Sequence, residues 1–359
     1  MKIAGWLATC FLAVLLLATA CTPAPEKDDT STAQFLSVTP REGYLEARDA
    51  VGRRFALIPR GSPRPAGFPP HMTVEIPVKR VVSASGAFDS GIMVALGVED
   101  ALVGQAEPPE QWLPTIRRGY EQGRIAFIGL WNTLDYERIK QLRPDLALAS
   151  GDPTTIDMLT QMDLPAVITF NNAHCNLESR LKFFAFLAAF FDRGERAAQL
   201  RQNFATALAE VQAKIGQRPR PTVSWVIAQE KRAFVLSGHY WLAELFGLTG
   251  GDYLFSEVGT DHEISLEYLI QKSGQADIFF VNTWVPPRSK RDLIRLNPIL
   301  APLKALGPEG RAYVVQSILF QETGRLDEVV RDLAAIMHPE VFPDRKLLYF
   351  RLLPMENPD

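Results

Sequence analysis

The chain has 359 residues and a formal net charge of −3, with 38 basic and 41 acidic residues. This near balance lacks the basic excess that binds polyanions, so nucleic acid is not expected as a partner. The length suits two folded domains behind a terminal segment. Because Cys10 and Cys21 lie in that terminal segment and Cys175 stands alone, an internal disulfide in the folded part is excluded. Cys175 has the character of a small buried apolar residue.

The first 20 residues have the layout of a secretory signal peptide, with Lys2 before an almost wholly apolar run over residues 3–20. Small residues stand directly before Cys21, as in the recognition sequence of lipoprotein signal peptidase. We therefore predict cleavage before Cys21, which then carries the lipid. An uncleaved membrane anchor is the alternative, because about 18 apolar residues can just cross a bilayer. Both predictions place the rest of the chain outside the cytoplasm.

Residues 21–76 are predicted to form a lipid-anchored tether and an N-terminal extension. Residues 22–32 are polar and hold no large apolar side chain, so they cannot bury enough surface to fold. Further along, a short strand is predicted from the apolar residues Val51, Phe55, Leu57 and Ile58. Prolines between residues 63 and 70 then interrupt regular structure. The sequence does not reveal a role for this extension.

Residues 77–175 alternate between strand and helix patterns and form the predicted first lobe. The predicted strands cover residues 80–83, 101–104, 145–150 and 166–170. The predicted helices cover residues 88–96, 134–142 and 154–162, with Gly97 ending the first and Asn132 or Thr133 capping the second. This alternation predicts a parallel sheet with helices on both faces.

A long helical segment and a second lobe follow. Residues 176–217 carry apolar side chains at helical spacing, with an expected break at residues 192–194. In the second lobe, residues 218–359, the predicted strands are 223–228, 233–236, 277–281 and 312–315, and the predicted helices are 240–248, 266–272 and 326–337. The predicted fold class is therefore α/β: two α/β lobes with mainly parallel central sheets, joined by a long interdomain helix.

Three segments have the order and spacing of one protein family. Residues 78–104 contain the sequences ALG and LVG, and residues 128–149 contain Trp131, Glu137 and the sequence LRPDL. Residues 264–280 contain Glu267 and the sequence ADI. Together, over about residues 76–338, these segments resemble the periplasmic binding proteins that carry iron–siderophores, haem and cobalamin to ABC importers.

The resemblance implies two lobes that hold a ligand in a shallow cleft and move little because the interdomain helix is rigid. It also implies a monomer that docks on a membrane permease. Glu137 and Glu267, one in each lobe, match the family's surface glutamates, which enter arginine-lined pockets on the permease. Such paired charges would orient the binding protein as it meets the permease. Ordinary helix-surface glutamates are the alternative.

Ligands of open α/β sheets lie beyond the carboxyl ends of the strands. That rule selects loops 83–88, 131–133 and 150–154 in the first lobe and 229–232, 237–241 and 282–291 in the second. Aromatic faces with a few polar groups suit a large, mostly apolar ligand. The candidate ligand-binding residues are Ser85, Gly86, Trp131, Asp152, His239, Tyr240, Trp241, Trp284 and Arg288.

These candidates have different roles and competing explanations. Trp131 matches a cleft tryptophan of the resembling family, whereas Trp241 and Trp284 are equally compatible with packing under a loop. Arg288 is a candidate partner for an anionic chelate, with a solvated surface charge as the alternative. His239 is a candidate haem ligand, although isolated histidines commonly serve no ligand.

The cargo predicted by the resemblance is an iron chelate, with cobalamin or haem as alternatives, and no intrinsic cofactor is expected. The five histidines lack the close spacing of a metal site, so a bare metal ion is disfavoured. An enzyme that uses the same cleft is the rival from another class. The chain has no G-x-S-x-G, P-loop or H-E-x-x-H motif, so a non-enzymatic role is predicted. A lipid-anchored scaffold module without a cleft is a third possibility.

Overall fold

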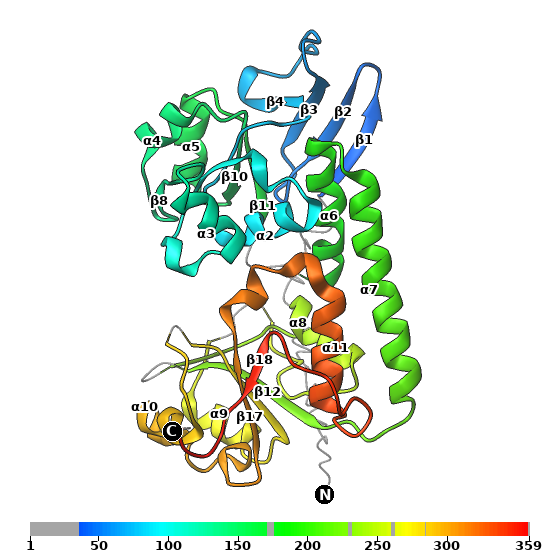
Figure 1. Cartoon of the computed structure of the whole chain (residues 1–359), viewed down its shortest axis with the longest axis vertical. Coiled ribbons are helices and arrows are strands. Elements are labelled where there is room, and N and C mark those ends of the chain that lie inside the picture. Colours follow the sequence, from blue (N-terminus) through cyan, green and yellow to red (C-terminus); the bar gives the residue numbers. More distant parts are fainter. Residues whose placement is uncertain (1–35, 171–175, 229–231, 260–262, 284, 358–359) are drawn as a thin grey trace, which may run out of the picture. The chain divides into compact units, whose positions relative to one another are not determined.

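A computed structural model describes residues 36–170, 176–228, 232–259, 263–283 and 285–357 (Figure 1). In these ranges, no helix combines the length and the apolar character needed to cross a membrane. The predicted signal peptide, the lipidation site Cys21 and the candidate Trp284 lie outside the described residues. Their assignments therefore stay predictions.

The N-terminal extension contains a four-stranded sheet, most of which the sequence did not predict. Its strands, in the order β1-β2-β3-β4, are β1 (Ser37–Arg41), β2 (Tyr44–Arg48), β3 (Arg54–Pro59) and β4 (Thr73–Ile76). The sheet packs on the interdomain helix α6 through β1 and β4. Phe55, Leu57 and Ile58 are buried in β3, but Val51 lies in the preceding turn and is 42% exposed. The predicted strand was therefore correct at these three positions and wrong at Val51.

The first lobe has a five-stranded sheet in which every neighbouring pair is parallel. Its order is β11-β10-β5-β6-β7, so the chain begins in the centre, moves to one side and then crosses to the other. Loops at such a reversal form the usual ligand crevice of doubly wound sheets. The strands are β5 (Val81–Ser83), β6 (Leu102–Gln105), β7 (Ala126–Phe127), β10 (Leu146–Ser150) and β11 (Ala166–Phe170).

Four helices connect these strands: α2 (Ala87–Leu96), α3 (Pro114–Glu121), α4 (Tyr136–Leu142) and α5 (Pro153–Gln161). Short 3-10 turns also occur, η1 (Pro70–Met72), η2 (Glu99–Ala101) and η3 (Pro109–Gln111). Gly97 ends α2 with φ 69°, a left-handed conformation that glycine adopts without strain. The sequence correctly predicted α2, α4 and α5 but missed α3.

The start of α4 differs from the prediction. Thr133 and Leu134 form strand β9 (Thr133–Leu134), which pairs antiparallel with β8 (Gly129–Leu130) in a tight hairpin. The helix begins later, where the carboxylate of Asp135 accepts a hydrogen bond from the backbone N–H of Arg138 at 2.8 Å. Neither Asn132 nor Thr133 is therefore the N-cap. A carboxylate satisfies the free N–H groups of a first helical turn equally well.

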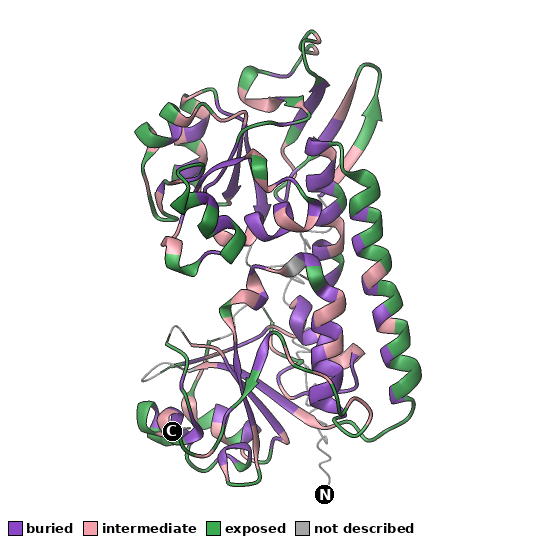
Figure 2. Cartoon of the chain, viewed as in Figure 1, coloured by how far each residue is buried: buried purple, intermediate pink, exposed green. Residues whose placement is uncertain are grey.

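The interdomain segment consists of two helices that pack side by side (Figure 1), α6 (Leu177–Phe191) and α7 (Gly194–Ile215). Asp192 separates them in a left-handed conformation with φ 55°, at the predicted break. Figure 2 shows α6 buried along most of its length, whereas α7 is buried on one side, where it packs on α11 (Leu326–Met337). The burial of α6 makes it the central element of the interdomain segment.

The second lobe has a seven-stranded mixed sheet. Its order is β15-β13-β12-β16-β17-β18, with β14 paired to β12. The central pairs β12–β16 and β16–β17 are parallel, whereas β13, β15 and β18 run antiparallel to their neighbours. The strands are β12 (Thr222–Ala228), β13 (Ala233–Val235), β14 (Asp252–Tyr253), β15 (Glu263–Ile264), β16 (Ile278–Val281), β17 (Arg311–Val315) and β18 (Phe350–Leu352).

The helices of this lobe are α8 (Trp241–Leu248), α9 (Leu266–Ser273), α10 (Lys290–Leu296) and α11, with 3-10 turns η5 (Pro298–Leu300), η6 (Lys304–Leu306), η7 (Ser317–Phe320) and η8 (Thr323–Arg325). The sequence missed α10, whose start lies inside the predicted loop 282–291. It also missed β18, which the buried carboxylate of Asp332 anchors by accepting from the backbone N–H of Leu348 and of Tyr349. The α/β fold class, with two lobes joined by a long helical segment, is confirmed.

Candidate functional site

The loop after β5 is tied to the neighbouring strand β10. The backbone N–H groups of Ala84 and Ser85 both donate to the carbonyl of Leu148, at 2.8 and 3.3 Å. The hydroxyl of Ser83 donates to the carbonyl of Gly86 at 2.7 Å. These bonds fix two predicted ligand residues, Ser85 and Gly86, at the carboxyl edge of the sheet, beside the reversal in strand order.

Gly86 makes room for a side chain from the next loop. Its φ is 90°, and a Cβ atom there would lie 2.9 Å from the Cγ of Glu107. Any larger residue would therefore combine backbone strain with a steric clash. The glycine brings the loops after β5 and β6 into contact.

Trp131 is presented to solvent at the tip of the β8–β9 hairpin. Its side chain is 55% exposed, and the nearby Phe127 and Leu130 are 40% and 41% exposed. The backbone N–H of Trp131 donates to the Oε1 of Glu107 at 3.4 Å. The hairpin therefore presents a large, accessible aromatic surface beside the loops of β5 and β6, as its predicted role requires.

Glu107 links these loops, and the sequence reasoning missed it. Its backbone N–H donates to the carbonyl of Gly129 at 3.0 Å, and its own carbonyl accepts from the Nε1 of Trp112 at 2.8 Å. The residue has φ 73°, a conformation that glycine normally occupies. The carboxyl-edge rule, applied to the loop after β6 as well, would have pointed to it.

Asp152 has a structural partner. It is the N-cap of α5, and its Oδ2 accepts from the backbone N–H of Thr155 at 2.7 Å. The side chain is half-buried, at the carboxyl end of β10. Capping accounts for one of its carboxylate oxygens, and ligand binding by Asp152 stays a prediction.

A buried charged cluster lies below the loop of Ser85. The hydroxyl of Ser85 donates to the carboxylate of Asp89, which is fully buried on α2. Burial raises the pKa of Asp89 to about 6, although the Ser85 hydrogen bond and the charge of Arg180 lower it. Arg180, from α6, is also buried, with its guanidinium 4.0 Å from the ring centroid of Phe88. The cluster supports the first-lobe edge from beneath.

The second-lobe candidates around α8 are less accessible. Trp241 is fully buried and lies 5.1 Å from the guanidinium of Arg180, so in this structure it is a core residue and not a surface for a ligand. Tyr240 is half-buried at the N-cap of α8, and His239 is exposed in the preceding turn. Because β13 runs antiparallel to β12, the carboxyl-edge rule does not apply to this loop. Residues 229–231 lie outside the described residues.

Near α10, Arg288 is exposed, whereas Lys290 is buried. The ammonium of Lys290 donates to the carbonyls of Gly307 and Gly310, at 2.8 and 2.5 Å, and burial lowers its pKa. Lys290, although it lies in the selected loop 282–291, is therefore not available to a ligand. Arg288 stays a candidate.

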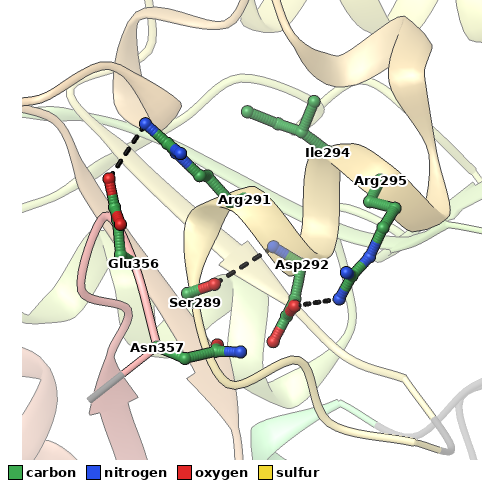
Figure 3. A pocket seen from close by; sticks show the side chains of 7 residues that line it. All are labelled: Ser289, Arg291, Asp292, Ile294, Arg295, Glu356 and Asn357. Atoms are coloured by element: carbon green, nitrogen blue, oxygen red, sulfur yellow. Dashed lines mark hydrogen bonds and ion pairs between the residues drawn. The ribbon is translucent and has the colours of Figure 1, made fainter. Parts of the chain in front are cut away.

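A cavity of about 510 Å³ lies beside α10 (Figure 3). Its charged residues neutralise one another: Arg291 pairs with Glu356 at 2.9 Å, and Arg295 pairs with Asp292. None of the predicted ligand residues that the structure describes lines it. The lining residues are Ser289, Arg291, Asp292, Ile294, Arg295, Glu356 and Asn357.

The two candidate docking glutamates occupy equivalent positions. Glu137 follows the N-cap of α4 by two residues, and Glu267 follows the N-cap Ser265 of α9 by two. Both are exposed, and neither forms an ion pair with a described residue. The helix N-terminus favours a negative charge at both places. Across the described ranges, no three histidine, cysteine or carboxylate side chains gather as metal ligands.

Comparison with known proteins supports the resemblance of the three segments. The model of the periplasmic binding protein family matches residues 82–314. An uncharacterized lipoprotein of Methanocaldococcus jannaschii is 24% identical over 332 residues, which cover 86% of this chain and 78% of the relative. The vitamin B12-binding protein of Vibrio parahaemolyticus is 22% identical over 210 residues, with coverages of 57% and 71%.

The fold also matches solved structures. A periplasmic haem-binding protein of Pseudomonas aeruginosa superposes with a TM-score of 0.62 at 22% identity, over 79% of this chain and 100% of that protein. The family match covers well over half of the sequence and contains the loops that carry Gly86, Glu107 and Trp131. The chain therefore belongs to the periplasmic binding protein family.

Proposed function

We propose that this protein is the solute-binding lipoprotein of an ABC importer, and that it captures a bulky metal chelate, of the iron(III)–siderophore type, at the facing edges of its lobes. Trp131 carries the proposal. Its ring is more than half exposed at the carboxyl edge of a doubly wound sheet, where such sheets bind ligands. An exposed tryptophan on a hydrogen-bonded hairpin provides a flat apolar surface for a large planar or chelated ligand.

Cobalamin or haem in the same role is the main alternative. The relative named for vitamin B12 is similar in sequence and the protein named for haem is similar in fold, both at low identity, and vitamin B12 and haem are also large metal complexes. His239 would serve a haem iron, because it is exposed in the turn before α8. Arg288 would accept an anionic group of a chelate. We expect binding without chemical change, because the family is one of binding proteins.

Delivery would use the two helix-terminal glutamates. Glu137 and Glu267 lie at matching positions on α4 and α9, both exposed, as a two-point electrostatic contact with a permease requires. We propose that Cys21 carries the lipid that keeps the exported, monomeric protein beside the membrane. The relative named as a lipoprotein supports this anchor.

A titration tests the cargo. Residues 22–359 are purified without lipid, and tryptophan fluorescence is followed while ferric siderophores, haemin or cobalamin are added, with calorimetry for the absorbing ligands. We expect one class to bind saturably, and we expect Trp131→Ala to weaken that binding at least tenfold, or about 1.4 kcal/mol. Leu352→Ala, which truncates a residue 51% exposed on β18, is the control and should bind normally. If the folded protein binds none of these ligands, the proposal is contradicted.

A further inference from the structure

Three loops of the first lobe meet at the carboxylate of Glu107. Its Cγ lies against Gly86 in the loop after β5, and its Oε1 accepts from the backbone N–H of Trp131 on the hairpin. The side chain is half-buried, so its carboxylate remains accessible beside the exposed Trp131 ring. Glu107 therefore lies where a ligand stacked on Trp131 would place its edge.

The backbone at Glu107 is strained for a residue with a side chain. A left-handed conformation costs a non-glycine residue about 1 kcal/mol, and φ here is 73°. The indole N–H of Trp112 and the carbonyl of Gly129 hold this conformation by hydrogen bonds. Glycine would fit the same backbone without strain. Asp192 shares a positive φ at a helix end, whereas Glu107 lies in a loop, where retained strain supports a need for the side chain itself.

The described loops around Glu107 carry acidic side chains but no basic ones. No described lysine or arginine lies within ion-pair distance of its carboxylate. Four loops that the structure describes at this edge, residues 84–88, 106–111, 130–133 and 150–154, contain Glu107, Glu110 and Asp152 but no lysine or arginine; the loop after β11 lies outside the described residues. A carboxylate that is partly removed from water attracts cations and N–H donors and repels anions.

We propose that Glu107 determines specificity on the first-lobe edge, by selecting a ligand with a cationic or N–H donor edge and rejecting strongly anionic chelates. This inference rests on the proposed function and narrows its cargo class. Ferric hydroxamates with a pendant ammonium group and corrinoids with an amide periphery satisfy the requirement. Ferric tris-catecholates, which carry several negative charges, do not.

Two ferric probes of opposite charge test the proposal on the full chain purified in detergent. Ferrioxamine B is the cationic ferric trihydroxamate, and ferric enterobactin is the anionic tris-catecholate. We expect calorimetry to show tighter binding of ferrioxamine B, with a preference that shrinks as salt is added. Glu107→Gln keeps the size and the acceptor for the Trp131 N–H, and should weaken ferrioxamine B about tenfold while strengthening ferric enterobactin. Glu121→Gln, an exposed carboxylate on α3, makes the same change in net charge and should leave both affinities unaltered.

A second variant separates specificity from packing. Glu107→Gly removes the strain and the charge together, so the thermal midpoint should stay equal or rise while the charge preference disappears. If Glu107→Gln shifts both affinities equally, or neither, while Trp131→Ala still weakens binding, the inference is overturned and the proposed function stands. If neither these probes nor haemin or cobalamin binds the wild-type chain, the proposed function fails and the inference fails with it.

Discussion

The carboxyl edges of the two sheets differ in what they offer a ligand. In the five-stranded sheet of the first lobe every neighbouring pair is parallel, and the loops of Gly86, Glu107 and Trp131 converge on one place. In the second lobe the sheet is mixed, and the side chains of the candidate Trp241 and of Lys290, which lies in a selected loop, are buried in the protein. The comparison shows that a parallel sheet gathers its carboxyl-end loops at one edge, whereas an antiparallel strand breaks that rule for the loop that follows it.

The largest expected effect is the difference in unfolding free energy between alanine variants of two tryptophans, Trp241 in the second lobe and Trp131 in the first. Trp241→Ala removes a fully buried side chain and should lower the free energy of unfolding by about 3–5 kcal/mol. Trp131→Ala should change it by less than about 0.5 kcal/mol, because the ring is exposed. Urea denaturation of both variants gives the values. Trp241→Phe is the control, since a smaller aromatic ring keeps most of the packing. Equal losses from the two alanine variants would abolish the distinction between the lobes.

The pH dependence of stability should have opposite signs at two aspartates, one in each lobe. The folded-state pKa of Asp89 is raised to about 6, so its contribution to stability is fully present below its unfolded pKa and is lost as pH rises to about 6. Relative to wild type, Asp89→Asn should therefore gain about 1–3 kcal/mol of unfolding free energy between about pH 4 and pH 7.

Asp277 in the second lobe behaves the other way. Burial opposes its ionisation, but hydrogen bonds from Lys304 and Thr222 outweigh that effect and hold its pKa at about 2. Its contribution is present above the unfolded pKa and is lost as pH falls towards 2. Asp277→Asn should therefore lose stability relative to wild type as pH rises from about 2 to 5. Denaturation series for both variants, each subtracted from wild type, supply the measurement. The same sign at both sites would contradict the account.

Two glycines test the close approach of the first-lobe loops. Gly61, in the N-terminal extension, has φ 79° and open space where a Cβ atom would stand, so Gly61→Ala should cost about 1 kcal/mol from strain alone. Gly86→Ala adds the clash with Glu107 and should cost about 2 kcal/mol. It should also weaken ligand binding, which Gly61→Ala should leave unchanged. Thermal unfolding and calorimetry on the pair provide the comparison, and equal costs would argue against the contact.

The smallest effect on stability is expected at the docking glutamates. Glu137→Gln and Glu267→Gln are exposed changes and should alter the unfolding free energy by less than about 0.5 kcal/mol. Each should nevertheless reduce uptake of the cargo in cells, and a double variant should reduce it further. Glu178→Gln, an exposed glutamate on α6, is the matched control. Normal uptake by the double variant would contradict the proposed docking role of the two glutamates.

The sequence predicted the fold where apolar periodicity is strong. The buried strand β10 and the helices α2, α6, α7 and α11 lie within a few residues of their expected positions. The sheet of the N-terminal extension was largely missed, because strands such as β1 are short and mostly polar. Leu134, the last residue of the Trp131 hairpin, was assigned to the following helix, since apolar spacing alone cannot show where a cap lies.

The site was only partly predictable. Ser85, Gly86 and Trp131 were predicted because they follow strands or match a family pattern, and the structure places all three at the carboxyl edge of the sheet, but their ligand role stays a prediction. Glu107 could not be recognised by type, because a left-handed glutamate has no sequence signature. Trp241 is buried beside Arg180, which is distant in sequence. Such contacts are properties of the tertiary structure.

Hydrogen–deuterium exchange with a bound cargo tests the central claim, that the ligand binds on the first-lobe edge. A probe found to bind in the titration is added at saturation, and protection is mapped along the chain. The account predicts protection of residues 106–111 and 129–134, which carry Glu107 and Trp131. Protection confined to α10 and the C-terminal residues around its cavity, with the hairpin unchanged, would contradict it.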